Sequence, residues 1–298
     1  MIKIVKDIKD ANCITHSGTM HADEVFATAF LELYLENIKL IRVSNVPKDI
    51  AKDVLVYDIG RGKFDHHQDD VDTRDNGIKY SSIGLLWKEY GKDYLKKNNI
   101  DNIDDVFKAI DKDLIEGIDA IDNGIFPEIE ANYKVKTLSD VIKLFNPSSF
   151  TDEDEATQFL KAEKFAKEIF IETMYNAIGK IKSKEIVNEI INKTDGPILE
   201  LEEYLPYEEA ILTNDKGNDL LFVTYPSNRG GYAIKTIPKS IEDKTDRLLL
   251  PKSWAGLANE ELEKVTGIEG VMFCHTNRFI ATAKTKESIK ALAKKALE

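Results

Sequence analysis

Residues 12–24, NCITHSGTMHADE, join a short apolar run to a loop that carries two histidines and two acidic side chains. Apolar residues then recur at helical spacing over residues 22–35. Two short apolar runs, LIRV at 40–43 and VLVY at 54–57, have the character of buried strands. This order predicts an α/β domain with a mostly parallel sheet and helices on its faces. Ligands bind beyond the carboxyl ends of such strands, where the polar clusters lie.

Further along the chain, helical patterns occupy residues 82–98, 104–121 and 151–192. The third is long and charged, and Thr151–Asp154 give it an acidic, capped start. The breaker Thr194–Pro197 follows it, and we place a domain boundary there. The first domain is then residues 1–193, with a helical linker from about residue 151.

Residues 194–298 have a different sequence pattern, in which strand-like runs alternate with turns and short helices. We expect strands at 219–225 and 231–236, a helix at 259–265, two more strands at 270–274 and 279–282, and a basic C-terminal helix. This pattern predicts a smaller C-terminal α+β domain. Trp254 within it is interpreted as a core residue, with base stacking as the alternative.

The composition is that of an ordinary soluble globular protein of 298 residues, with 42% hydrophobic and 32% charged residues. No stretch approaches the ~20 apolar residues of a membrane helix, and the first residues lack a signal-peptide pattern. We expect a cytoplasmic location, no membrane partner, and buried thiols at Cys13 and Cys274. A net charge of −12 disfavours non-specific nucleic-acid binding. It does not exclude a nuclease, because bound cations reverse the local field.

Four of the five histidines lie in the first 67 residues, close in sequence to several aspartates. Imidazole and carboxylate together form the ligand set of manganese, iron, zinc or cobalt sites. Each residue alone has a plainer structural interpretation, such as a helix cap or a turn, but their coincidence at strand ends favours a metal site. The candidates are His16, His21, Asp23, Asp58, Asp65, His66, His67, Asp119 and Asp122.

The chemistry that such a site supports is hydrolysis at phosphorus. Two cations clamp the attacking and leaving oxygens of an in-line displacement. Asp58 ends the strand-like run 54–57, so it suits a carboxylate that bridges both cations. The sequence contains no GxxxxGK[ST] phosphate loop and no GxSxG nucleophile turn, which excludes two other classes of hydrolase.

Joined together, these motifs resemble the DHH phosphoesterase superfamily, and more closely its melanocyte proliferating gene one branch. The resemblance extends over nearly the whole chain. The motifs that carry it are Thr15-His16-x4-His21-x-Asp23-Glu24, Asp58-Ile59-Gly60, Phe64-Asp65-His66-His67-Gln68, Ser81-Ser82-x-Gly84-Leu85, Ile118-Asp119-Ala120-Ile121-Asp122-Asn123-Gly124, Leu250-Pro251-x2-Trp254-x-Gly256-Leu257 and Phe273-x-His275-x3-Phe279-Ile280.

The resemblance implies a doubly wound catalytic domain, a linker and a smaller C-terminal domain, with two manganese or magnesium ions at the active site. It implies cleavage of phosphoanhydrides or phosphodiesters, and for this branch a 3′–5′ exonuclease acting on RNA. The usual superfamily start has an aspartate where this chain has His21, and one residue fewer in the spacing. Imidazole favours softer cations than magnesium, so manganese is expected first, with magnesium, cobalt, iron or zinc as alternatives.

Carried over by position, the resemblance also implies roles for single residues. Asp58 and His67 would be catalytic, His67 beside the phosphoryl group, and Asp65 would orient His66. Either Asp119 or Asp122 would be a ligand, with Asp122 favoured because it stands at the helix end. One cation would be held by His16, His21 and Asp58, and the other by Asp23, Asp58, His66 and Asp122.

The C-terminal domain would bind substrate. Arg229 offers a guanidinium beside two glycines whose backbone allows a close approach of phosphate. A solvated surface charge is the alternative interpretation for each cation. The full set of candidates is Ser82, Arg229, Gly230, Gly231, Arg247, His275 and Arg278.

Three functions compete on this basis. The first is an exonuclease or oligonucleotide phosphodiesterase acting on single-stranded RNA. The second is a hydrolase of a small phosphate compound, such as pyrophosphate or a cyclic dinucleotide, and the acidic net charge is in its favour. The third is a non-catalytic metal- or nucleotide-binding regulator. The sequence leaves a homodimer open.

Overall fold

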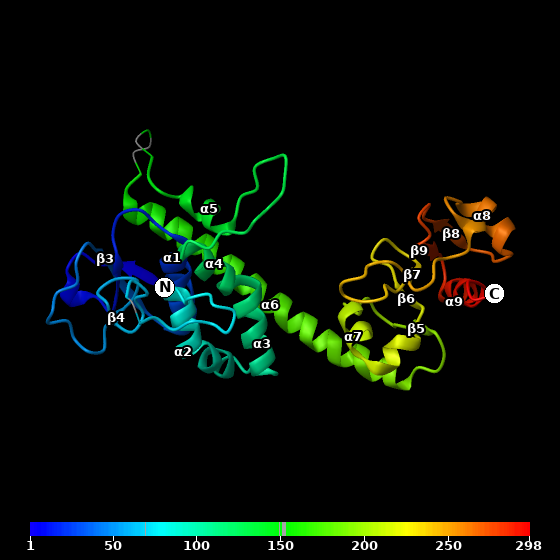
Figure 1. Ribbon diagram of the computed structural model, residues 1–298, viewed down its shortest axis with the longest axis horizontal. Helices are drawn as coiled ribbons and strands as arrows, with labels where there is room; N and C mark the ends of the chain where they lie inside the picture. Colours follow the sequence, from blue (N-terminus) through cyan, green and yellow to red (C-terminus); the bar gives the residue numbers. More distant parts are fainter. Residues whose placement is uncertain (69, 149, 151–152) are drawn as a thin grey trace. The chain divides into compact units, whose positions relative to one another are not determined.

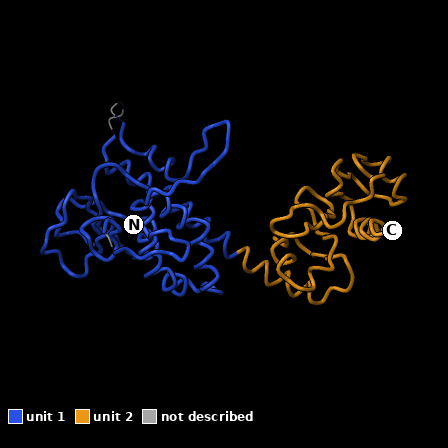
Figure 2. The backbone as a smooth tube through the Cα atoms, viewed as in Figure 1, with its two compact units in different colours: residues 1–178 blue, residues 179–298 orange. Residues whose placement is uncertain are grey.

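A computed structural model describes residues 1–68, 70–148, 150 and 153–298. The chain divides into two compact units, residues 1–178 and 179–298 (Figure 2). The division falls within one long helix, α6 (Glu155–Lys193), whose last turns pack on the second unit. The turn Thr194–Pro197, where the sequence pattern places a boundary, ends this helix.

Unit 1, drawn in blue to green in Figure 1, contains a four-stranded sheet in the order β1-β3-β2-β4, and every pairing in it is parallel. The predicted strands at 12–15, 40–43 and 54–57 are present as β2, β3 and β4, while β1 escaped prediction because three residues carry no periodicity. The strands are β1 (Ile2–Ile4), β2 (Cys13–His16), β3 (Ile38–Val43) and β4 (Leu55–Val56).

The helices of unit 1 confirm the α/β prediction, although the doubly wound arrangement stays a prediction. The helix expected at 104–121 is one helical run interrupted by a π-helical turn at Asp111–Ile115, a feature often found near functional sites. The helices are α1 (Ala22–Tyr34), α2 (Ser82–Lys97), α3 (Ile103–Ile110), α4 (Glu116–Asp122), α5 (Leu138–Lys143) and α6.

Aromatic packing joins three of these helices. Phe30 of α1 lies edge-on to Trp87 of α2, with ring centroids 5.3 Å apart, and Phe170 of α6 meets Trp87 at 5.5 Å. Such pairs add stability beyond the area they bury. At the start of α6, the expected cap residues Thr151 and Asp152 lie outside the described residues, and Asp154 accepts a hydrogen bond from the backbone of Thr157.

Unit 2 is built on a mixed five-stranded sheet in the order β5-β6-β7-β9-β8, in which only β5 and β6 pair in parallel among the described strands. Its alternation of strands and helices fits the predicted α+β class. The elements are β5 (Ile198–Glu200), α7 (Glu208–Thr213), β6 (Phe222–Pro226), β7 (Tyr232–Thr236), α8 (Asn259–Thr266), β8 (Val271–Cys274), β9 (Ile280–Ala283) and α9 (Lys286–Lys295), with short 3-10 turns at Asp215–Asp219 and Lys252–Trp254.

Two hydrophobic clusters build the core of this unit. One contains Trp254 with Leu262 of α8 and Leu292 of α9, and it confirms that Trp254 is a core residue. The other joins Val187 of α6 and Ala210 of α7 to the sheet. The second cluster explains why the last turns of α6 belong to unit 2.

Candidate metal centre

The carboxyl ends of β2 and β4 bring the first two candidates together. His16 is the last residue of β2, and Asp58 follows β4 after one bridging residue. The two strands are parallel neighbours, so their ends meet at one edge of the sheet. Asp58 has a left-handed backbone (φ 56°), and its N–H donates to the carbonyl of Phe64. This unusual backbone conformation occurs at a functional position, as is common for such residues.

The two carboxylate oxygens of Asp58 face different histidines. Oδ2 lies 3.1 Å from Nε2 of His16, and Oδ1 lies 3.1 Å from Nε2 of His66. Asp58 itself is only 2% exposed. A buried carboxylate placed between two imidazoles has the geometry needed to bridge two cations.

Helix α1 contributes two further carboxylates from its first turn, Asp23 and Glu24, and both are fully buried. The N-terminus of a helix favours negative charge, and Glu24 also accepts the backbone N–H of His21 at 3.0 Å. Oxygen atoms of Asp23, Glu24 and Asp58 lie within 4.8 Å of one another. Three buried carboxylates at this separation repel each other unless cations lie between them.

His66 completes the cluster from the loop after residue 64. Its Nε2 lies 3.0 Å from an oxygen of Asp122 at the end of α4, and 3.8 Å from Asp23. His21 joins Asp23 and Asp122 in a group whose ligand atoms lie within 4.8 Å of one another. The structure therefore brings together all six residues that the sequence nominated as metal ligands.

The pKa values of this cluster show how strongly it attracts positive charge. Burial lowers the pKa of His16, but a hydrogen bond to Asp58 and the charge of Glu24 outweigh it and raise the pKa to about 9. Burial also lowers the pKa of His66, but hydrogen bonds to Asp122 and Asp58 outweigh this effect and raise the pKa to about 10. Burial raises the pKa of Glu24 to about 8. The cluster binds protons where it would otherwise bind metal.

A second observation indicates that these residues fit a metal ion. Oδ1 of Asp23 is buried, and no described residue donates a hydrogen bond to it. Buried carboxylate oxygens without donors are costly unless a cation coordinates them. Imidazole and carboxylate donors in this mixture suit manganese and its neighbours.

Comparisons with known proteins show the family of this chain. The model of the MYG1 exonuclease family, described as an uncharacterised protein family (UPF0160), matches residues 12–297. The chain belongs to this family. Membership confirms the resemblance to the melanocyte proliferating gene one family, and with it the prediction of a hydrolase that acts on phosphoester bonds.

MYG1 relatives match along almost the full chain. The MYG1 protein YER156C of Saccharomyces cerevisiae is 32% identical over 95% of this chain and 94% of its own length. The MYG1 protein of Dictyostelium discoideum is 30% identical over 97% of both chains, and the human MYG1 exonuclease is 28% identical over 95% of this chain and 85% of its own. A solved pGpG-specific phosphodiesterase from Vibrio, 13% identical over 95% of both chains, aligns with a TM-score of 0.31, which is too low to establish a shared fold.

The two serines of the Ser81-Ser82-x-Gly84 motif donate hydrogen bonds to aspartates at or beside the candidate metal centre. The hydroxyl of Ser82 donates to Oδ2 of Asp23 at 2.9 Å, and Ser82 is fully buried. Ser82 therefore holds a candidate ligand, and its expected contact with substrate is wrong. Ser81 donates its N–H and its hydroxyl to Asp119 at 3.1 and 2.5 Å.

Asp119 is engaged away from the proposed metal ligands. Its other oxygen accepts from Nη1 of Arg74 at 2.5 Å, and Arg74 also pairs with Asp111 in the π-helical turn at 2.6 Å. Burial raises the pKa of Asp119 to about 6, although Arg74 opposes the shift. The geometry thus favours Asp122 as the ligand and gives Asp119 a supporting role.

Asp65 contacts His67 and not the neighbour that we expected. It accepts from the backbone and from Nδ1 of His67 at 3.0 and 2.8 Å, and from the N–H of Arg61 at 2.6 Å. The prediction that Asp65 orients His66 is wrong, because its two oxygens accept from His67 and from Arg61. The side chain of His67 is 60% exposed, at the mouth of the cluster.

Sequence reasoning missed several residues around the centre. Arg42 on β3 donates to the carbonyl of His16 and pairs with Glu155 at 2.5 Å, so it holds the end of β2 where the first histidine lies. Arg61 lines a pocket of about 360 Å³ with His16 and His67. Lys143 lines a smaller one of about 140 Å³ with His21 and Asp122. A basic residue after a ligand motif was the available signal for Arg61, whereas Lys143 gave none.

The substrate candidates of unit 2 lie at two opposite ends of its sheet. Arg229, Gly230 and Gly231 form the turn before β7, next to the end of β9, because Tyr232 pairs with Ala283. His275 and Arg278 lie in the turn before β9, next to Lys235 near the end of β7. Strands rise about 3.3 Å per residue, so roughly 10 Å or more separates the two groups.

These positions distinguish the candidates. Arg229 is exposed, and a Cβ on Gly231 would lie 2.3 Å from the carbonyl of Ala283, so this glycine is required by close backbone packing. Arg247 donates to the carbonyls of Pro238, Gly217 and Leu220 at 3.0, 2.5 and 2.8 Å. Arg247 is thus occupied in holding loops, and its expected role in substrate binding is wrong.

The other two candidates are partly engaged. Arg278 donates one bond to the carbonyl of Leu250 at 3.2 Å, and Nδ1 of His275 accepts the N–H of Asn277 at 3.0 Å. Both side chains remain half-buried.

Both cysteines are fully buried, as expected, and burial raises the pKa of Cys13 to about 12. No helix among the described residues combines the length and the apolar character needed to cross a membrane.

Proposed function

We propose that this chain is a metal-dependent phosphodiesterase that removes nucleotides from the 3′ end of RNA or of short oligonucleotides. The observation that carries the proposal is the placement of Asp58, with one carboxylate oxygen toward His16 and the other toward His66. The human relative is named an exonuclease. Two divalent cations, manganese first, would be held by the six clustered ligands and would share Asp58.

Bound cations would lower the pKa of an attacking water and neutralise charge on the phosphoryl group. The side chains of the chain supply orientation. Nδ1 of His67 is directed at Asp65, so Nε2 is the ring nitrogen that faces a substrate oxygen. Arg61 lines the pocket that contains His67, and Lys143 lines the pocket that contains Asp122. Both cations would contact the nonbridging phosphate oxygens.

Unit 2 would contribute to substrate binding through the turn at Arg229–Gly231, which is exposed and has glycine backbone at φ 92° and 67°. His275 and Arg278 would contact a second part of a longer strand, because they lie at the other end of the sheet. A cytoplasmic location and a homodimer remain predictions.

The second candidate function is hydrolysis of a small phosphate compound, such as pyrophosphate or a cyclic dinucleotide. The same cluster would serve it. A net charge of −12 favours a substrate with few phosphates, because each further phosphate is repelled by the acidic surface.

A substrate panel with 5′-labelled single-stranded RNA, pyrophosphate and a cyclic dinucleotide, each with and without manganese, tests both functions. We expect a ladder of shortened 5′-labelled products, abolished in Asp58→Asn and unaffected in the matched control Asp75→Asn, which changes an exposed aspartate of a nearby loop. Consumption of pyrophosphate alone would select the second function. Wild-type turnover in Asp58→Asn would remove the bridging role.

A further inference from the structure

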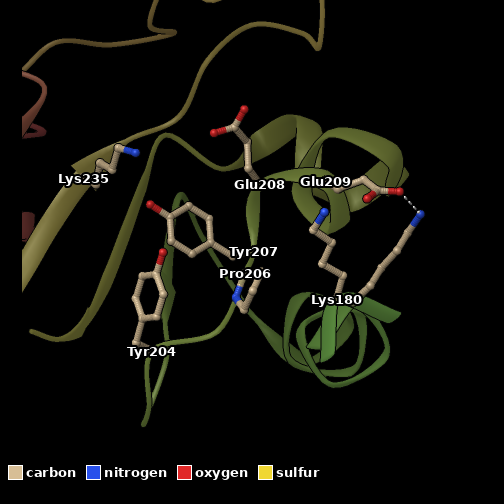
Figure 3. A pocket seen from close by; sticks show the side chains of 8 residues that line it. Lys180, Tyr204, Pro206, Tyr207, Glu208, Glu209 and Lys235 are labelled. Atoms are coloured by element: carbon tan, nitrogen blue, oxygen red, sulfur yellow. Dashed lines mark hydrogen bonds and ion pairs between the residues drawn. The ribbon is translucent and has the colours of Figure 1, made fainter. Parts of the chain in front are cut away.

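A pocket of about 270 Å³ lies wholly within unit 2. Its walls come from the end of α6, the loop before α7, the first turn of α7, and β7 (Figure 3). The volume is close to the lower end of the ~300–1,000 Å³ range of small-molecule sites, so the pocket has room for about one nucleotide. The lining residues are Lys180, Lys184, Tyr204, Pro206, Tyr207, Glu208, Glu209 and Lys235.

The pocket has a surplus of positive charge in a protein that is acidic overall. Lys184 pairs with Glu209 at 2.8 Å, and Lys244, from outside the lining, pairs with Glu208 at 2.6 Å. Both carboxylates are therefore neutralised. Lys235 has no ion-pair partner within 4.0 Å among the described residues, so its charge is available to an anion.

Aromatic rings form the other wall. Tyr204 is 50% exposed, yet its ring is fixed edge-on against Tyr225 at a centroid distance of 5.3 Å. Tyr207 packs on the same ring at 5.7 Å and is buried. Figure 3 shows the hydroxyls of Tyr204 and Tyr207 on the side of the pocket where the amine of Lys235 lies. A fixed, exposed ring beside a cation is the arrangement that stacks a base and binds its phosphate.

We propose that this pocket binds one nucleoside phosphate unit, with the base on Tyr204 and the phosphate at Lys235. An acidic peptide would use the lysines but would leave the exposed ring without a partner, so the tyrosine favours a nucleotide. The class of ligand rests on the proposed function, and the pocket would bind a nucleotide of the strand at a distance from the bond that is cut.

The test measures binding of a fluorescently labelled oligouridylate to the full chain by anisotropy, in EDTA so that no strand is cut. Lys235→Ala should weaken binding about tenfold and lower the slope of log K against log salt by about 0.7, the value for one phosphate contact on a single strand. Tyr204→Ala should also weaken binding about tenfold, while Tyr204→Phe, which keeps the ring, should stay within about twofold of wild type.

Lys264→Ala on α8, an exposed lysine outside the pocket, is the charge-matched control and should leave the affinity unchanged. Competition with a nucleoside monophosphate shows whether one unit suffices or a strand is required, and either result supports the proposal. The proposal is wrong if Lys235→Ala and Tyr204→Ala both bind like wild type, or if a polyglutamate peptide displaces the strand equally well.

Failure of the proposed function would be recognised separately. Hydrolysis of a small chromogenic phosphodiester with manganese depends on the metal cluster and should be lost in Asp58→Asn but retained in Lys235→Ala. If the wild-type chain does not hydrolyse it while strand binding still depends on Lys235, the phosphodiesterase assignment fails and the binding site stands.

Discussion

Replacing Gly84 by alanine should destabilise unit 1, although helix propensity alone predicts the opposite. Gly84 lies in the first turn of α2, where alanine is favoured over glycine by about 1 kcal/mol. A Cβ at this position would lie 2.1 Å from Oδ2 of Asp119 and 2.8 Å from both its Cγ and Oδ1. No side chain tolerates these distances, so the carboxylate of Asp119 must move.

Moving Asp119 breaks a buried network. Its carboxylate accepts from Ser81 and from Arg74, and all three residues are buried. Breaking a buried ion pair costs about 3–5 kcal/mol, so after the gain in propensity the free energy of unfolding should fall by about 2–4 kcal/mol.

Urea denaturation followed by the fluorescence of Trp87 measures this change, in a Trp254→Phe background so that the signal reports unit 1 alone. Gly117→Ala in α4 is the matched control. Gly117 is exposed, and a Cβ there would meet nothing within 4 Å, so this variant should gain about 0.5–1 kcal/mol. If Gly84→Ala were as stable as Gly117→Ala, the argument that Gly84 makes room for Asp119 would be refuted.

Three further predictions concern other parts of the chain. Ser82→Ala removes the hydroxyl that donates to Asp23 and should weaken manganese binding about 10–100-fold in calorimetric titrations, and an unchanged affinity would contradict the role of Ser82. Arg247→Ala should lower the thermal stability of unit 2 without changing KM, whereas Arg229→Ala should raise KM without unfolding; the reverse pattern would exchange their roles. Burial and the charge of Glu32 raise the pKa of Glu163 to about 8 from 4.5, so between these pH values the folded state keeps a proton that the unfolded state has lost. Stability should fall as pH rises through this window, by at most about 1.4 kcal/mol per pH unit, and Glu163→Gln should flatten the slope; an equal slope in both proteins would disprove the assignment.

Local sequence patterns were sufficient for most of the fold. Strands β2 and β3 and helices α1 and α2 follow from apolar periodicity, because each must bury one face or both. Short elements such as β1 and β5 were missed, since three residues show no period. The π-helical turn at Asp111–Ile115 was also missed, because it is accompanied by a long-range ion pair between Asp111 and Arg74.

The candidate site divides in the same way. The candidate ligands at strand ends could be predicted from sequence, because parallel strands place their carboxyl ends at one edge of the sheet. This rule predicts His16 and Asp58. The side chains that contact these ligands and their neighbours could not be predicted from sequence. Arg42 pairs with Glu155 and Arg74 pairs with Asp119, and nothing in the local sequence of either arginine indicates which carboxylate it contacts.

The amino-acid sequence by itself determined the class of domain, the candidate metal ligands and the family, since these depend on local order and on motifs within short segments. Only the tertiary structure decided that Ser82 supports Asp23, that Asp65 contacts His67, and that Arg247 is bound to backbone carbonyls. The physical reason is that a hydrogen bond depends on direction and on distances of about 3 Å, which are set when remote segments pack together.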